Sequence, residues 1–198
     1  MSNIIIHISG LPGSGKTTLG EKLQKIYTNI IVYDTDGFIQ HHNKEGKQLF
    51  KLNEEKKWKE YKILWKKIIK NKINEIISKY QNKTIVFIGS LDNLAPPNTI
   101  YKINADYKFL LDIPLNELIK RYYLKIYYME QKSTKIQSDN YWINLSQGIN
   151  HISSSDDLIK EHKKYNDWHK KHKYIFLDDN SIIDKICDII KLNNNCNY

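Results

Sequence analysis

The chain has 198 residues, of which 40% are hydrophobic and 27% charged, with a formal net charge of +9 at pH 7. This balance is typical of a chain with a buried core, and it excludes disordered, collagen-like and disulfide-stapled proteins. No apolar run approaches the roughly 20 residues of a membrane-spanning helix, and the N-terminal residues lack the basic start of a signal peptide. The length fits one domain over residues 1–198. The two cysteines, Cys187 and Cys196, have no metal-site spacing, so we expect them to be reduced, as in the cytoplasm.

Apolar runs alternate with helical patterns along the chain. The short runs predict buried strands at 3–9, 30–34, 84–88, 107–113 and 174–177. Helically spaced apolar residues predict helices at 17–27, at 54–80 as one helix or two in tandem, and after Pro114. A polar helix is predicted at 155–172, where Ser154 or Ser155 can serve as the N-cap, and a last helix at 181–192. Strands that alternate with helices predict an α/β fold with a five-stranded parallel sheet.

A phosphate-binding motif follows the first predicted strand directly. Residues 10–17 match the pattern G-x-x-x-x-G-K-[ST] in full, with a strand before the motif and a helix after it. Glycines let backbone N–H groups point at phosphate oxygens, and the helix N-terminus adds partial positive charge. Lys16 can reach the β- and γ-phosphates of ATP, the Thr17 hydroxyl can bind Mg²⁺, and Thr18 can bond the α-phosphate. The predicted nucleotide-binding residues are Gly10, Leu11, Pro12, Gly13, Ser14, Gly15, Lys16, Thr17 and Thr18.

With this motif, the chain resembles the P-loop kinases of the adenylate kinase and shikimate kinase group. The resemblance extends over essentially the whole chain, because the length, the position of the motif and the five strands agree. It implies a three-layer P-loop fold with strand order 2-3-1-4-5, an acceptor-binding region at 37–80 and a helical lid at 121–153. The N-K-x-D motif with which GTPases recognise their base is absent from the sequence.

Two carboxylates follow the second predicted strand. Asp34 and Asp36 are two residues apart, so on an extended strand their side chains point to the same face. The carboxyl ends of parallel strands line the ligand crevice, which predicts that both lie beside Lys16 and Thr17. The segment resembles the D-[ST]-D of shikimate kinases, which implies that Asp34 helps to hold the metal and that Asp36 contacts the acceptor hydroxyl. Asp36 followed by Gly37 is also ordinary turn chemistry.

The third predicted strand ends differently from the corresponding strand of many NTPases. Gly89 and Ser90 stand where an acidic residue is common, and this increases the expected importance of Asp34 for the metal. Gly89 could let an acceptor approach the backbone closely, or it could simply end the strand.

The helix predicted after Pro114 carries Arg121 and Lys125, which are four residues apart and therefore lie on one helix face. This segment resembles the start of the lid in nucleotide kinases. The resemblance implies that Arg121 packs against adenine and touches phosphates, and that Lys125 reaches the transferring phosphoryl group. Because Arg121 is the only arginine among 31 basic residues, the multi-arginine clamp of the family is in doubt.

The loop after the last predicted strand contains Asp179, Asn180 and Ser181. In kinases of this group the corresponding loop packs on the adenine edge, which implies base contacts from these residues. Asn180 or Ser181 could equally cap the last helix.

Three functions fit these residues. The first is an ATP-dependent kinase that moves the γ-phosphoryl group of Mg-ATP to a small-molecule, nucleoside or nucleotide acceptor. Its predicted catalytic residues are Lys16, Asp34, Asp36, Arg121 and Lys125, with Thr17 and Asp34 as metal ligands. The second is a polynucleotide 5′-hydroxyl kinase, favoured by the charge and by the aromatic residues at 58–65 and 122–142 but opposed by the lack of an arginine shortly after Asp36. The third is a non-catalytic ATP-binding module. No feature indicates a membrane partner or an oligomeric state.

Overall fold

The computed structural model describes residues 2–11, 13–39, 42–89, 92–93, 99–121, 124 and 155–194. A five-stranded parallel sheet runs through it in the order β2-β3-β1-β6-β7. The strands are β1 (Ile4–Ser9), β2 (Ile30–Asp34), β3 (Thr84–Ile88), β6 (Tyr107–Leu111) and β7 (Ile175–Leu177). The predicted α/β fold and the strand order 2-3-1-4-5 are therefore confirmed.

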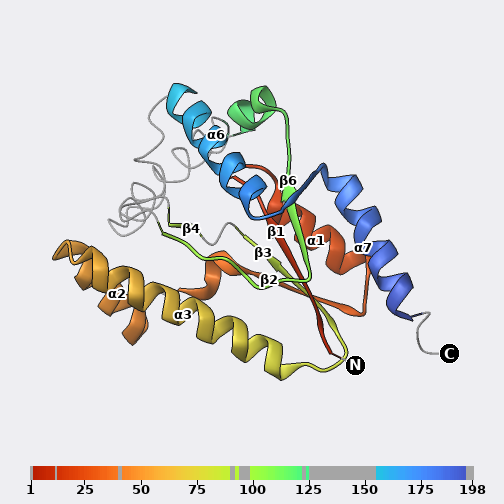
Figure 1. Cartoon of the computed structure of the whole chain (residues 1–198), viewed down its shortest axis with the longest axis horizontal. Coiled ribbons are helices and arrows are strands. Elements are labelled where there is room, and N and C mark those ends of the chain that lie inside the picture. Colours follow the sequence, from red (N-terminus) through yellow and green to blue (C-terminus); the bar gives the residue numbers. More distant parts are fainter. Residues whose placement is uncertain are drawn as a thin grey trace, which may run out of the picture.

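Helices cover both faces of the sheet, which makes three layers (Figure 1). On one face, α1 (Lys16–Ile26) and α7 (Asp179–Asn194) form a core with β1 and β3 through residues such as Leu23 and Ile186. On the other face, α3 (Trp58–Lys79) packs residues such as Trp65 and Ile69 against β3. A third apolar cluster joins α6 (Ser155–Lys171) to β6 and to Leu11 in the loop after β1. Among the described helices, none is long and apolar enough to cross a membrane.

The segment before β3 differs from the prediction. The structure has α2 (Lys44–Glu54), which the sequence analysis did not predict, and α3 begins only at Trp58. Asn43 caps α2 because its side chain accepts a hydrogen bond from Gly46 N at 2.7 Å. Lys56, with a φ of 52°, takes a left-handed conformation that interrupts the helical path between α2 and α3.

The turn that Asp36 and Gly37 offered as an alternative is present after β2, whereas the short strand pair after β3 was not predicted. A 3₁₀ turn, η1 (Thr35–Phe38), follows β2 directly. A short antiparallel pair, β4 (Asp92–Asn93) and β5 (Thr99–Ile100), follows β3. After β6, residues 115–121 are helical as predicted, whereas the lid expected at 121–153, apart from Arg121 and Leu124, lies outside the described residues.

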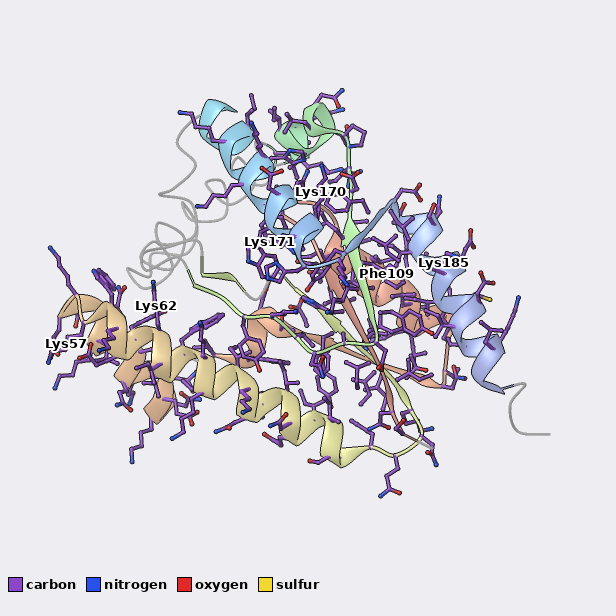
Figure 2. All side chains as sticks on the ribbon, viewed as in Figure 1. Lys57, Lys62, Phe109, Lys170, Lys171 and Lys185 are labelled. Carbon is purple, nitrogen blue, oxygen red and sulfur yellow. The ribbon has the colours of Figure 1, made fainter. Side chains whose placement is uncertain are left out.

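The lysines that give the chain its charge occupy several separate elements (Figure 2). Lys57 and Lys62 lie at the α2–α3 end of the molecule, Lys170 and Lys171 on α6, and Lys185 on α7. These five lysines therefore lie on different sides of the described fold.

Candidate active site

The predicted phosphate-binding motif forms the loop between β1 and α1. Ser14 N donates to Leu11 O at 3.0 Å, and Gly15, with a φ of 96°, caps α1 in a left-handed conformation that favours glycine. Lys16 begins α1 and is buried, and its Nζ donates to Gly10 O at 2.6 Å and to Leu11 O at 3.0 Å. The ammonium group of Lys16 is therefore held against the carbonyl groups of the loop.

Asp34 connects the end of β2 to this loop. Thr17 Oγ1 donates to Asp34 Oδ2 at 3.3 Å, and Asp36 N donates to Asp34 Oδ1 at 2.9 Å. The second bond caps η1, so Asp36 lies on a 3₁₀ turn and the predicted geometry, with both acids on one extended strand, is wrong. The two carboxylates still lie at the same edge of the sheet, and Asp34 uses one oxygen for the turn and the other for Thr17.

Gly89 lies behind these acids at the end of β3. A Cβ atom at Gly89 would overlap Thr35 Oγ1 and would lie 3.2 Å from Asp36 Oδ1. Gly89 has little freedom to move away, because its N–H donates to Ile8 O at 3.0 Å and its carbonyl accepts from His7 Nε2 at 3.0 Å. With a φ of 146°, this position requires glycine, and the close approach comes from the chain's own Thr35.

A pocket of about 230 Å³ opens on the other side of the loop, and we call it the Arg121 pocket. Arg121 Nη1 donates to Ser14 O at 3.4 Å and its Nε donates to Glu117 Oε1 at 2.9 Å, so the guanidinium is held over the loop. Lys22 and Asp179 form an ion pair of 2.8 Å at the rim. The pocket is lined by Ser14, Gly15, Thr18, Leu19, Lys22, Leu111, Ile113, Arg121, Asp178 and Asp179.

The loop after β7 contributes to this pocket through one predicted residue, Asp179, and one that was not predicted, Asp178. Asp178 and Asp179 line it, while in the described part of the chain Asn180 and Ser181 do not. Asp178 caps α7, because its side chain accepts bonds from Ser181 N at 2.8 Å and from Ser181 Oγ at 3.0 Å. These bonds lower the pKa of Asp178, and the ion pair with Lys22 lowers the pKa of Asp179. The alternative prediction, that Asn180 or Ser181 caps the last helix, is therefore wrong, because Asp178 is the capping residue.

The remaining predicted site residues are partly outside the described chain. Thr18 is exposed at the rim of the Arg121 pocket. Pro12 and Lys125 lie outside the described residues, so their predicted roles remain predictions.

The loop and its neighbours fit a nucleotide phosphate and Mg²⁺. The buried Ser14 Oγ has no hydrogen-bond partner within the described part of the chain, as expected where a ligand or water completes the bonding. Thr17 and Asp34 offer the oxygen ligands that Mg²⁺ prefers. The described residues contain no group of three or more His, Cys, Asp or Glu suited to a metal.

A buried polar cluster adjoins the loop, and the sequence analysis did not predict it. Tyr174 O–H donates to His7 Nδ1 at 2.6 Å, and Ser9 Oγ lies 2.6 Å from the Tyr165 hydroxyl and 2.8 Å from His169 Nε2. Because carbonyl groups only accept, the hydrogens of the two imidazoles are on His7 Nε2, facing Gly89 O, and on His169 Nδ1, facing Tyr165 O. The available signal was the pair of polar residues, His7 and Ser9, within the apolar run of β1.

The cluster makes stability depend on pH. Burial lowers the pKa of His7 to about 3, with smaller contributions from His169, Lys108 and Lys16, and burial lowers the pKa of His169 to about 4. Between pH 6.5 and pH 4 the unfolded chain binds protons that the folded chain does not, so the free energy of unfolding falls as pH falls. We expect a loss of up to about 1.4 kcal/mol per pH unit for each histidine, measured by urea denaturation.

His7→Gln, which keeps a donor and an acceptor but does not titrate, is expected to show a smaller pH slope than the wild type. The exposed His42 provides the matched control, since His42→Gln is expected to keep the wild-type slope. Equal slopes for His7→Gln and the wild type would contradict this explanation.

A family model described as an AAA domain matches residues 6–142. A shikimate kinase from Clostridium botulinum is 34% identical over 130 residues, which make up 64% of this chain and 68% of that protein. A shikimate kinase from another strain of this species is 33% identical over 130 residues, with the same coverage.

Solved structures share the fold. A shikimate kinase from Bacteroides thetaiotaomicron has a TM-score of 0.52 at 17% identity, covering 95% of this chain and 98% of its own. A shikimate kinase from Acinetobacter baumannii, solved in complex with shikimate, has a TM-score of 0.52 at 17% identity, covering 96% and 94%. At such identities the likeness shows the fold, and the match in sequence carries the family relationship.

Proposed function

Since this chain belongs to the P-loop kinases of the adenylate kinase and shikimate kinase group, we propose that it transfers the γ-phosphoryl group of Mg-ATP to a hydroxyl group of a small molecule. The observation that carries this proposal is the contact of Asp34 with Thr17, at 3.3 Å, next to the loop that holds Lys16. It brings a carboxylate, a hydroxyl and a buried ammonium group to one place. These are the groups that phosphoryl transfer requires at the phosphates.

On the nucleotide side, Lys16 would bind the β- and γ-phosphates, and Thr17 with Asp34 would hold the metal. Bound Mg²⁺ would neutralise charge on the phosphates and orient them for transfer. Arg121 would pack on the base and touch phosphates, since the Glu117 ion pair already directs its guanidinium over the loop. Lys125 would reach the transferring group.

On the acceptor side, Asp36 would orient or deprotonate the attacking hydroxyl, with η1, α2 and α3 forming the acceptor region at 37–80. The chemistry of this region favours an acceptor with few anionic groups. Arginine binds carboxylates and phosphates through two parallel bonds, and the single arginine of the sequence lines the Arg121 pocket. We therefore rank neutral hydroxylated molecules above shikimate and nucleoside monophosphates.

A coupled assay of ADP release with Mg-ATP tests the proposal across acceptor classes. The panel contains neutral polyols, nucleosides, shikimate, nucleoside monophosphates and 5′-hydroxyl oligonucleotides. We expect ADP release above background with one small-molecule class, and a fall of at least about 100-fold in Lys16→Met, which removes the ammonium group from the phosphates. Silence across the panel from a protein that binds ATP would count against transfer to these acceptors.

The alternative of a polynucleotide kinase has less support. Its proposed stacking surface includes Trp65, which is buried, and Tyr61, which packs against the same core. The five lysines labelled in Figure 2 also lie at separate places in the fold, whereas a nucleic-acid groove needs basic residues on one path. The setting that we propose is the cytoplasm, where ATP is available and cysteines stay reduced.

A further inference from the structure

We infer that Tyr165 is a positioning residue of the phosphate-binding loop, whose hydroxyl holds the Gly10 carbonyl when Lys16 turns towards the phosphates. This inference rests on the proposed binding of a nucleotide at residues 10–17 and concerns the binding step alone. Tyr165 lies on α6, beyond the residues 6–142 that the family model matches, and 155 positions from Gly10 in sequence.

The Gly10 carbonyl lies between two donors. Lys16 Nζ donates to it at 2.6 Å, and the Tyr165 hydroxyl oxygen lies 3.3 Å from it. Tyr165 is 3% exposed and Lys16 9%, so water does not readily replace either group. A carbonyl oxygen has two lone pairs and can accept both bonds. The shorter bond belongs to Lys16, while Tyr165 is in reach as a second donor.

Binding of phosphates changes this arrangement because an ammonium group has only three hydrogens. Bonds to two phosphate groups, together with the present bonds to Gly10 O and Leu11 O, would require four. At least one loop carbonyl must therefore be released. Leu11 O keeps Ser14 N as a donor at 3.0 Å, and Gly10 O keeps the Tyr165 hydroxyl. Without that hydroxyl, release of Lys16 would leave a buried acceptor without this donor, which is costly.

The surroundings of Tyr165 allow its hydrogen to move between two acceptors. Ser9 Oγ, at 2.6 Å, is one acceptor, and Gly10 O is the other. Ser9 donates its own hydrogen to His169 Nε2 at 2.8 Å, since His169 Nδ1 donates to Tyr165 O at 2.7 Å. The Tyr165 and His169 rings also lie 4.1 Å apart, centroid to centroid, which fixes the phenol in place. The Tyr165 hydrogen can thus turn from Ser9 Oγ to Gly10 O, which gives up the bond from Tyr165 to Ser9, while the bond from Ser9 to His169 remains.

The test is the affinity for Mg-ATP, measured by titration calorimetry without an acceptor. Tyr165→Phe removes only the hydroxyl, and we expect a Kd about tenfold higher than in the wild type. The matched control is Tyr174→Phe, which removes another buried hydroxyl of the same cluster, bonded to His7 at 2.6 Å and not to the loop. We expect this control to lose stability in urea while its Kd stays within about twofold of the wild type.

A double-mutant cycle with Lys16→Met separates positioning from a general loss of structure. Without the ammonium group there is no release of Gly10 O, so adding Tyr165→Phe to Lys16→Met is expected to leave the Kd unchanged within about twofold. An equal effect of Tyr165→Phe in both backgrounds, an equal effect of Tyr174→Phe, or no effect of Tyr165→Phe would each overturn the inference. A wild-type protein that does not bind Mg-ATP would overturn the proposed function instead, and this inference with it.

Discussion

Asp36→Asn is expected to lower phosphotransferase turnover by about 100- to 10,000-fold while Mg-ATP still binds. The side chain of Asp36 is exposed on η1, and the bond to Asp34 comes from the backbone N–H of Asp36. Asparagine keeps that backbone bond and nearly the same shape, but its amide cannot take a proton from a hydroxyl group. The substitution therefore separates the proposed chemistry from the fold of the turn.

Steady-state kinetics with a reactive acceptor, combined with calorimetry for Mg-ATP, provides the measurement. Asp34→Asn is the informative comparison, because it should weaken the dependence on Mg²⁺ as well as turnover, given the contact of Asp34 with Thr17. Asp188→Asn removes an exposed carboxylate on α7 and is expected to keep wild-type activity. Full activity in Asp36→Asn would show that Asp36 does not act on the acceptor.

Gly89→Ala is expected to impair both stability and turnover. The added Cβ would overlap Thr35 Oγ1, and the φ of 146° is strained for alanine. Because hydrogen bonds to Ile8 and His7 hold Gly89 in place, Thr35 and Asp36 must move instead. We expect about 2–4 kcal/mol less unfolding free energy and at least about tenfold lower turnover.

The matched control for this substitution is Gly37→Ala. Gly37 follows Asp36 directly, and a Cβ atom at Gly37 would meet nothing within 4 Å. We expect Gly37→Ala to stay near wild type in urea denaturation and in turnover. Equal behaviour of the two alanine variants would contradict the packing of β3 against η1 described above.

Local patterns predicted the parts of the fold that depend on local chemistry. The glycines and Lys16 of residues 10–17 predicted the loop between β1 and α1. Each predicted apolar run is a strand, with ends within two residues of the predicted ones. The strand order came from the family resemblance, since spacing alone does not say which parallel strands are neighbours. It is now confirmed by the strand pairing.

The helix caps were not predicted correctly, because several neighbouring side chains could accept the capping hydrogen bonds. Asp178 and Ser181 are both good capping residues, and only the structure shows that Asp178 accepts the bonds. Asp34 likewise caps η1, which turns the chain away from the extended strand on which Asp36 was expected. Asp36 followed by Gly37 indicated a turn as the alternative, but alternation along a strand does not show at which residue the strand ends.

The polar cluster could not be derived from sequence for a different reason. Ser9 meets His169 and Tyr165 across separations of 160 and 156 positions, and His7 meets Tyr174 across 167. The sequence showed polar residues within an apolar strand but did not identify their partners. Each partner lies on or directly after α6, whose packing on β6 is a property of the complete fold.

Transfer of the labelled γ-phosphoryl group from ATP is the most direct measurement of the proposed reaction. The protein is incubated with Mg-ATP labelled at the γ-position and with the acceptor that releases most ADP, and the products are separated. We expect the label on a hydroxyl group of the acceptor, with Lys16→Met giving at most about one hundredth of the product. Label found only in inorganic phosphate, at the wild-type rate of ADP release, would show hydrolysis of ATP and contradict the proposed kinase reaction.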